Sequence, residues 1–234
     1  MMFSMQGMCR RVVAAVALAA IGMCGVAVSQ AASNGAAPGS GVTFTLDFPE
    51  SEPAHYSIAV DANGHAIYEC MVKLEASEEQ TYHWEFDVTP GNRERIFEWT
   101  KEAKYFSGKI DSGNHKLAFT GEKMLSYHDG QRLVTAQYNY SSLEPVRQLT
   151  ALFQSMAGTL DYGRRLSYYH HYQKLALDDE LKRMEAQAKE NELSEIQGVA
   201  PVLQGIVADS SVINVVRARA KELIQMGSGG MAGH

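Results

Sequence analysis

The chain has very few cysteines, three in 234 residues. Cys9 and Cys24 lie in an N-terminal segment that is predicted to be removed, so Cys70 alone remains in the mature chain. A single cysteine cannot form an internal disulfide, and the stability of the fold must therefore come from a packed core. Cys70 alternates with Tyr68 and Val72, which predicts a small buried residue of a strand rather than a nucleophile.

Recognisable catalytic and nucleotide-binding motifs are absent. The sequence contains no phosphate-binding loop, no dinucleotide glycine fingerprint, no Gly-x-Ser-x-Gly elbow and no His-Glu-x-x-His helix motif. It therefore predicts no catalytic residue and no cofactor, and an enzyme is the less favoured class of protein.

Positive charge is also scarce, because 27 Asp and Glu residues outnumber 21 Lys and Arg residues and give a formal net charge of −6. Loss of Arg10 and Arg11 with the N-terminal segment changes this charge to −8. An acidic chain repels phosphate backbones, which argues against a nucleic-acid partner. The hydrophobic fraction of 45% and the charged fraction of 21% exclude a disordered or collagen-like chain.

The N-terminus has the order of features that a signal peptidase reads. Two consecutive arginines precede an apolar run over residues 12–28, and small residues follow. The pattern predicts a cleavable signal peptide over residues 1–31, with cleavage between Ala31 and Ala32. The mature protein is then exported by a bacterium and is periplasmic or extracellular. A retained membrane anchor is the alternative, because the run is about as long as the roughly 20 residues that span a bilayer.

The mature chain divides into a β-rich half and a helical half. Residues 32–41 are small and polar and predict a flexible leader, and the Gly-rich residues 227–234 predict a flexible tail. Between them, residues 42–140 are predicted to form a β-rich α+β domain, and residues 141–226 a helical region.

Apolar and polar residues alternate in the β-rich half, as in half-buried strands. Strands are predicted over residues 44–48, 56–60, 66–74, 82–88, 117–119, 125–127 and 134–140. Asp61–Gly64 and Asp129–Gly130 predict turns, because glycine accepts a positive φ. Thr89 followed by Pro90 predicts the start of a helix between strands, with Thr89 as its cap.

Beyond residue 140 the period at which apolar residues recur changes from 2 residues, as in a strand, to about 3.6 residues, which predicts helices. Ser141 and Glu144 have the spacing of a capping box at the start of the first helix. Helical segments are predicted over residues 146–160, 162–192, 193–207 and 211–226. Asp209 and Ser210 are expected to cap the last of them.

These patterns together predict an α+β fold. An antiparallel sheet of six or seven strands with an inserted helix is followed by a C-terminal helical region that packs on or beside the sheet. The length suits either one large domain or two small ones, since domains usually have about 100–150 residues.

The best candidate for a chemical site is the stretch that contains His83, Glu85 and Asp87. In a strand these three side chains share one face, while Trp84 and Phe86 point to the other. One imidazole and two carboxylates could hold a divalent metal or act as acid and base. The favoured interpretation is a solvated face above a buried one, because further ligands at a recognisable spacing are missing.

A second candidate is the run from Tyr168 to Tyr172, which contains two adjacent histidines. Adjacent residues on a helix point about 100° apart, so these histidines are not expected to bind one metal. The aromatic cluster is predicted to be a packing seam between the helices and the sheet, with a binding surface as the alternative.

The chain resembles a group of uncharacterised exported bacterial proteins of unknown function. The resemblance rests on YSIAVDANGHAIY at 56–68, GEKMLSYHDG at 121–130 and DSSVINVVRARA at 209–220. These stretches are spread along the mature chain and consist of predicted strands, turns and helix faces. The resemblance implies export and carries no assigned activity.

Three functional hypotheses remain open. The leading one is a non-catalytic binding or interaction protein that acts on another protein or a cell-envelope component, without contact to the membrane after cleavage. The second is a small hydrolase or metal-binding protein that uses the face of His83, Glu85 and Asp87. The third is a membrane-anchored structural protein of the cell envelope. A tyrosine-lined groove would favour the first, and a pocket that gathers His83 and Glu85 with further His or carboxylate groups would favour the second.

Overall fold

The computed structural model of the chain describes residues 39–73, 79–114 and 116–229. The predicted signal peptide, with its cleavage site between Ala31 and Ala32, lies outside these residues. So do most of the predicted leader and the last five residues of the predicted tail.

Six described strands form one antiparallel sheet in the order β4-β3-β2-β1-β5-β6. The strands are β1 (Gly41–Asp47), β2 (His55–Asp61), β3 (His65–Lys73), β4 (Glu79–Asp87), β5 (Glu122–His128) and β6 (Leu133–Tyr138). The α-helices are α1 (Pro90–Glu102), α2 (Glu144–Tyr172), α3 (Leu177–Lys189), α4 (Ala200–Ala208) and α5 (Asn214–Gly229). The 3-10 helices are η1 (Lys104–Phe106), η2 (Lys174–Ala176) and η3 (Ile196–Val199). This arrangement confirms the predicted α+β fold.

Both predicted hairpin turns are present. Between β2 and β3, Asp61 Oδ1 accepts the backbone N–H groups of Asn63 and His65, and Gly64 has a φ of +93°. Between β5 and β6, Gly130 has a φ of +80°. Residues other than glycine rarely adopt such backbone angles, so the two glycines determine where the chain reverses.

The strand predicted over residues 117–119 is wrong, because this segment is a loop. Its polar backbone atoms bind a side chain in place of a neighbouring strand. Asn139 Nδ2 donates to Ala118 O at 3.1 Å, and the N–H of Thr120 donates to Asn139 Oδ1 at 3.1 Å. The alternation of Leu117 and Phe119 is therefore a local pattern that tertiary contacts override.

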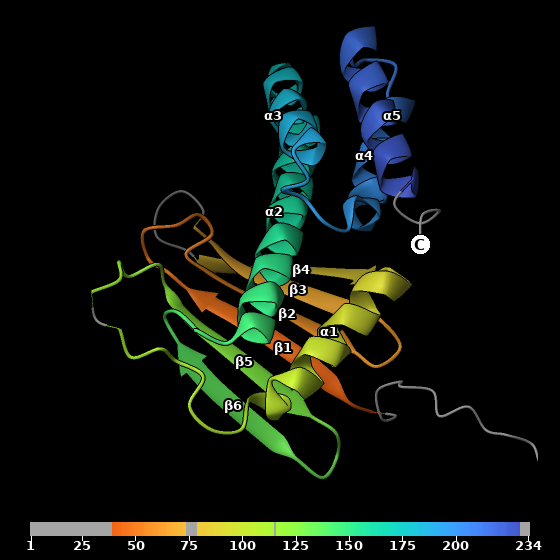
Figure 1. Ribbon diagram of the computed structural model, residues 1–234. Coiled ribbons are helices and arrows are strands. Elements are labelled where there is room, and N and C mark those ends of the chain that lie inside the picture. The colour runs from red at the N-terminus through yellow and green to blue at the C-terminus, as the bar shows by residue number, and fades with distance from the viewer. Residues whose placement is uncertain (1–38, 74–78, 115, 230–234) are drawn as a thin grey trace, which may run out of the picture. The chain divides into compact units, whose positions relative to one another are not determined.

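Helices α1 and the first half of α2 cover one face of the sheet (Figure 1), and the second half of α2 packs against α3, α4 and η3. The covered face carries a row of aromatic rings whose successive centroids lie 6.1 to 6.4 Å apart: Phe44, Tyr56, Tyr68, Tyr82 and Trp84. Phe153 of α2 stacks on Phe44 at 5.4 Å. Cys70 is buried in the same face, which confirms its predicted position.

Helix α1 begins at Pro90 with Thr89 as its N-cap residue, as predicted, but Thr89 binds a distant segment. The N–H of Thr89 donates to Glu195 Oε2 at 2.9 Å, and its hydroxyl donates to Glu195 Oε1 at 2.8 Å. Asn92 Nδ2 donates to the same carboxylate at 2.6 Å. The prediction that the Thr89 side chain caps α1 is therefore wrong, because its hydroxyl is engaged with Glu195.

The predicted capping box of α2 is also wrong. The N-cap residue is Leu143, and the Ser141 hydroxyl donates to Ile110 O at 2.6 Å while it accepts the N–H of Leu143 at 3.2 Å. Ser141 thus ties the start of α2 to the loop before β5. The sequence spacing alone did not reveal this partner, because Ile110 is 31 residues away.

The boundaries of the C-terminal helices also differ from those predicted. Helix α2 continues unbroken to Tyr172, and the chain then turns through η2 into α3. Helix α5 begins at Asn214, so Asp209 and Ser210 do not cap it. Asp209 instead accepts hydrogen bonds from Lys174 and Ser211. Helix α5 extends through Gly229, so the first three residues of the predicted tail are helical.

Candidate functional site

The strand face of His83, Glu85 and Asp87 points to solvent, as the alternation predicts. The three side chains do not converge on one point. His83 Nδ1 lies 3.2 Å from Glu69 Oε1 of β3, and His83 Nε2 lies 3.2 Å from Glu85 Oε1. Asp87 lies 3.7 Å from His65 of the neighbouring strand. Carboxylates and imidazoles therefore alternate along the surface of β3 and β4.

This arrangement pairs the histidines with acids and does not gather ligands around a cavity. In the described parts of the chain, no group of three or more His, Cys, Asp and Glu side chains is placed to hold a metal ion. The histidines of this face lie beside acids that can stabilise their protonated rings.

The titration of His83 is expected to report this pairing. Hydrogen bonds to Glu85 and Glu69 raise the pKa of His83 above its ordinary value of 6.5. The folded-state pKa is then higher than the unfolded one, so the stabilising contribution of the charged ring is present below the unfolded pKa. It is lost as the pH rises through the folded-state pKa.

NMR titration of the ring protons checks this prediction. The pKa of His83 should fall when Glu69→Gln and Glu85→Gln are combined, whereas Glu98→Gln on the exposed face of α1 should leave it unchanged. An equal pKa in the double variant and the parent protein would contradict the pairing.

A groove of about 390 Å³ lies between the first half of β4 and the C-terminal part of α2. Residues 80–83 of β4 and Val72 of β3 form one wall. The other wall is formed by side chains of α2 between Arg164 and Tyr172. Its volume falls within the range of about 300–1,000 Å³ that is typical of ligand pockets.

Tyrosines dominate the apolar part of this groove. Tyr168 is 48% exposed and Tyr172 is 74% exposed, and their ring centroids lie 5.1 Å apart. The predicted packing seam is therefore wrong for these two residues, although Tyr169 does pack against the core. The physical reason is that α2 turns these two rings toward the space beside β4. Tyr82, the neighbour of Trp84 in the buried aromatic row, forms the floor on the side of the sheet.

The charged lining of the groove is cationic. Arg164 donates to Asp161 at 2.8 Å, but Arg165 binds the same carboxylate. Arg164 also lies 3.9 Å from Glu52, and Arg165 pairs with Glu180, so both guanidinium groups have acidic partners outside the groove lining. His83 and His171 also line the groove, and the described lining residues include no carboxylate. Burial raises the pKa of Tyr82 to about 12, and this increase is reduced by Arg164.

The two adjacent histidines of α2 serve different contacts, as their angular separation predicts. His171 lines the groove, whereas His170 Nε2 lies 2.9 Å from Asp209 Oδ2 in the segment between α4 and α5. The second contact fixes the end of α2 against the last helices. It thereby sets the position of the tyrosine wall.

A second cavity, of about 490 Å³, adjoins the groove on the other side of Arg164. It is bounded by the loop between β1 and β2, by Met71 and Val72 of β3, and by Arg164. The two cavities share Val72 and Arg164, so a ligand that is longer than the groove has room to continue past the guanidinium group.

The groove lies beside an edge strand of the sheet. Strand β4 is the outermost strand on its side of the sheet. In the second half of β4, Trp84 Nε1 donates to Gly198 O of η3 at 3.0 Å. Residues 80–83 border the groove. An edge strand presents backbone N–H and C=O groups that can pair with another chain.

The sequence identified part of this site. His83 and the tyrosine run were singled out from their residue types. Arg164 and Tyr82 were missed, because neither belongs to a motif and the two meet only when α2 crosses the sheet. The helical stripe around Arg164 was the available signal, but it does not show which strand the helix crosses.

None of the described helices is both long and apolar enough to cross a membrane. Comparison of the chain with models of known protein families found no match, and comparison with curated proteins found no similar sequence.

Proposed function

We propose that the protein is an exported, non-catalytic binding protein that holds an extended, acidic segment of another polypeptide in the groove beside β4. The observation that carries the proposal is the edge strand β4, whose residues 80–83 border a groove lined by exposed tyrosines and by Arg164 and His171, without a carboxylate among the lining residues. Export is supported by the sequence of residues 1–31, which has the order of a signal peptide.

An extended peptide fits the geometry of the site. A bound segment can add to the edge of a sheet through backbone hydrogen bonds, while its alternate side chains enter flanking pockets. Residues 80–83 supply the edge, and Tyr168 and Tyr172 supply a broad contact surface on one side of it. Tyrosines give large contact area at a low entropic cost, which is why they are frequent at binding surfaces.

Charge selects the kind of peptide. Arg164 and His171 attract acidic side chains, and Arg164 in particular presents donors that match a carboxylate. A basic peptide would be disfavoured at the same positions. We therefore infer that the bound segment combines at least one acidic residue with aromatic or β-branched residues.

The alternative of a small hydrolase has less support. A nucleophile needs an adjacent base that a third group orients. The described lining of the groove offers two histidines without a cysteine or an acid in the same wall. His83 is engaged with Glu69 and Glu85 on the exposed face of the sheet.

Selection from a library of displayed random peptides tests the proposal. Peptides enriched on the parent protein should contain acidic residues, and a synthetic peptide of the enriched sequence should bind in fluorescence anisotropy. Combining Tyr168→Ala with Tyr172→Ala should weaken this binding at least about tenfold, since interface tyrosines often contribute 1–2 kcal/mol or more. Both rings are exposed, so the fold should be retained.

A matched control lies on the other edge of the sheet. Leu133 of β6 is an exposed apolar residue, and Leu133→Ala should leave peptide affinity unchanged. Bound peptide should also slow hydrogen exchange of the amides of residues 80–83. Peptides that bind the double tyrosine variant as tightly as the parent protein would refute the proposal, and so would a failure to enrich any peptide.

A further inference from the structure

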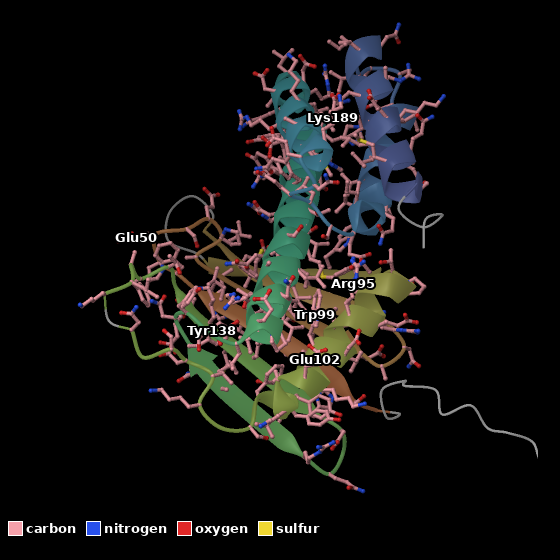
Figure 2. The ribbon with its side chains drawn as sticks, viewed as in Figure 1. Glu50, Arg95, Trp99, Glu102, Tyr138 and Lys189 are labelled. Atoms are coloured by element: carbon pink, nitrogen blue, oxygen red, sulfur yellow. The ribbon has the colours of Figure 1, made fainter. Side chains whose placement is uncertain are left out.

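A third cavity, of about 370 Å³, lies between the end of β6, the loop before β5 and the start of α2. It shares no lining residue with the groove beside β4. Tyr138, which is labelled in Figure 2, is the last residue of β6, and its hydroxyl lies 2.6 Å from the hydroxyl of Thr150 in α2. This contact forms one polar wall of the cavity.

A buried cation lines the same cavity. Lys123 is only 4% exposed, and its Nζ lies 2.9 to 3.3 Å from four oxygens that belong to Thr120, Gly121 and Asn139. All four oxygens are uncharged. A buried ammonium group is ordinarily paired with an acid, because the removal of its charge from water is costly. Burial accordingly lowers the pKa of Lys123.

Two acids of the neighbouring segments, Asp111 and Glu144, serve other groups. Asp111 accepts the N–H groups of Gly113 and Asn139. Glu144 accepts hydrogen bonds from Arg147 and Gln148. Among the described residues, no carboxylate forms an ion pair with Lys123.

A second cation and a helix end lie at the same cavity. Arg147 lines it from the first turns of α2. Its Nη1 donates to Ser142 O at 2.9 Å and its Nη2 donates to Glu144, which leaves its remaining N–H donors for a ligand. Helix α2 begins at Glu144 beside the cavity, and the N-terminal end of a helix carries a partial positive charge. The described lining residues include no acid, although Glu144, which pairs with Arg147, offsets part of this positive charge from outside the lining.

We propose that this cavity binds a small organic anion that carries a carboxylate or phosphate group. Arg147 holds the anionic group by charge-assisted hydrogen bonds, and the buried ammonium group of Lys123 stabilises it electrostatically. The hydroxyl of Tyr140 and the amide of Gln154, which also line the cavity, contact the rest of the molecule. The anion supplies the negative charge that the protein does not place beside Lys123. This site is independent of the peptide groove.

NMR titration of the full mature chain tests the proposal, with succinate and inorganic phosphate as separate probes and sodium chloride at equal ionic strength as the reference. At least one probe should shift the amide signals of residues 120–123 and 139–151 at concentrations of about 10 mM or below. The two probes distinguish a carboxylate from a phosphate ligand. Failure of both to shift these signals more than chloride does would overturn the proposal.

Variants assign the effect to the two cations. Arg147→Gln should weaken binding at least about tenfold, whereas Arg132→Gln, at an exposed arginine of the β5–β6 hairpin, should leave it unchanged. Lys123→Met should abolish binding if the variant folds, as judged by its circular dichroism. If it does not fold, Arg147→Gln alone decides, and unchanged binding in that variant would refute the site.

Discussion

Replacement of Glu195 by alanine is expected to lower the free energy of unfolding by about 3 kcal/mol, because it removes a buried carboxylate that several donors share. Glu195 is 5% exposed and accepts hydrogen bonds from Thr89, Asn92 and Gln197. Without the carboxylate, the N–H and hydroxyl of Thr89 and the amide of Asn92 lose their acceptor at the start of α1. The contact also joins two segments that are 106 residues apart.

Urea denaturation at neutral pH measures this effect. Glu192→Ala is the matched control, since this glutamate is exposed three residues earlier, and its unfolding free energy should change by less than about 0.5 kcal/mol. The free energy of unfolding of Glu195→Gln should lie between those of the two alanine variants. The amide oxygen still accepts hydrogen bonds, while the amide nitrogen faces other donors. Equal stabilities of Glu195→Ala and Glu192→Ala would show that the carboxylate does not stabilise the start of α1.

Phe153→Ala is expected to have a similarly large effect, a loss of about 4 kcal/mol in the free energy of unfolding. Phe153 is fully buried, and its ring stacks on Phe44 of β1 with centroids 5.4 Å apart. The substitution removes apolar surface and leaves a void at the point where α2 crosses the sheet. The sheet and the helix cannot both move to close it, because each is held by further packing.

Thermal or urea unfolding followed by circular dichroism checks the prediction. Leu175→Ala is the control for removal of a large apolar side chain. Leu175 is 98% exposed, so its replacement should change the free energy of unfolding very little. A Phe153→Ala variant as stable as the control would mean that α2 does not pack on β1 in this way. The same result would question the groove, since the crossing of α2 positions its tyrosine wall.

The two proposed sites depend on different parts of one helix. The start of α2, with Arg147, borders the proposed anion cavity, and its end, with Tyr168 and Tyr172, borders the peptide groove. The proposals are nevertheless separable, because each has variants that leave the lining of the other site intact. Loss of one binding activity does not imply loss of the other.

Local patterns determined much of the fold from the sequence by itself. The alternation in β4 correctly placed Phe86 inside and His83 outside, because successive side chains of a strand point to opposite faces. The glycines after Asp61 and Asp129 correctly marked two hairpin turns, since only their conformational freedom permits these backbone angles at low cost. These features depend on residues that are close together in the chain.

Tertiary structure decided the rest, because it depends on contacts between distant segments. Glu195 binds the N-cap residue of α1, the partner of Ser141 is Ile110, and the loop around Phe119 binds Asn139 in place of a strand. Periodicity identified the apolar stripe of α2 but not the strands that it crosses. The groove exists only because this crossing brings Arg164 and the exposed tyrosines beside the edge strand β4, and a periodic pattern contains no information on where a helix ends relative to a sheet.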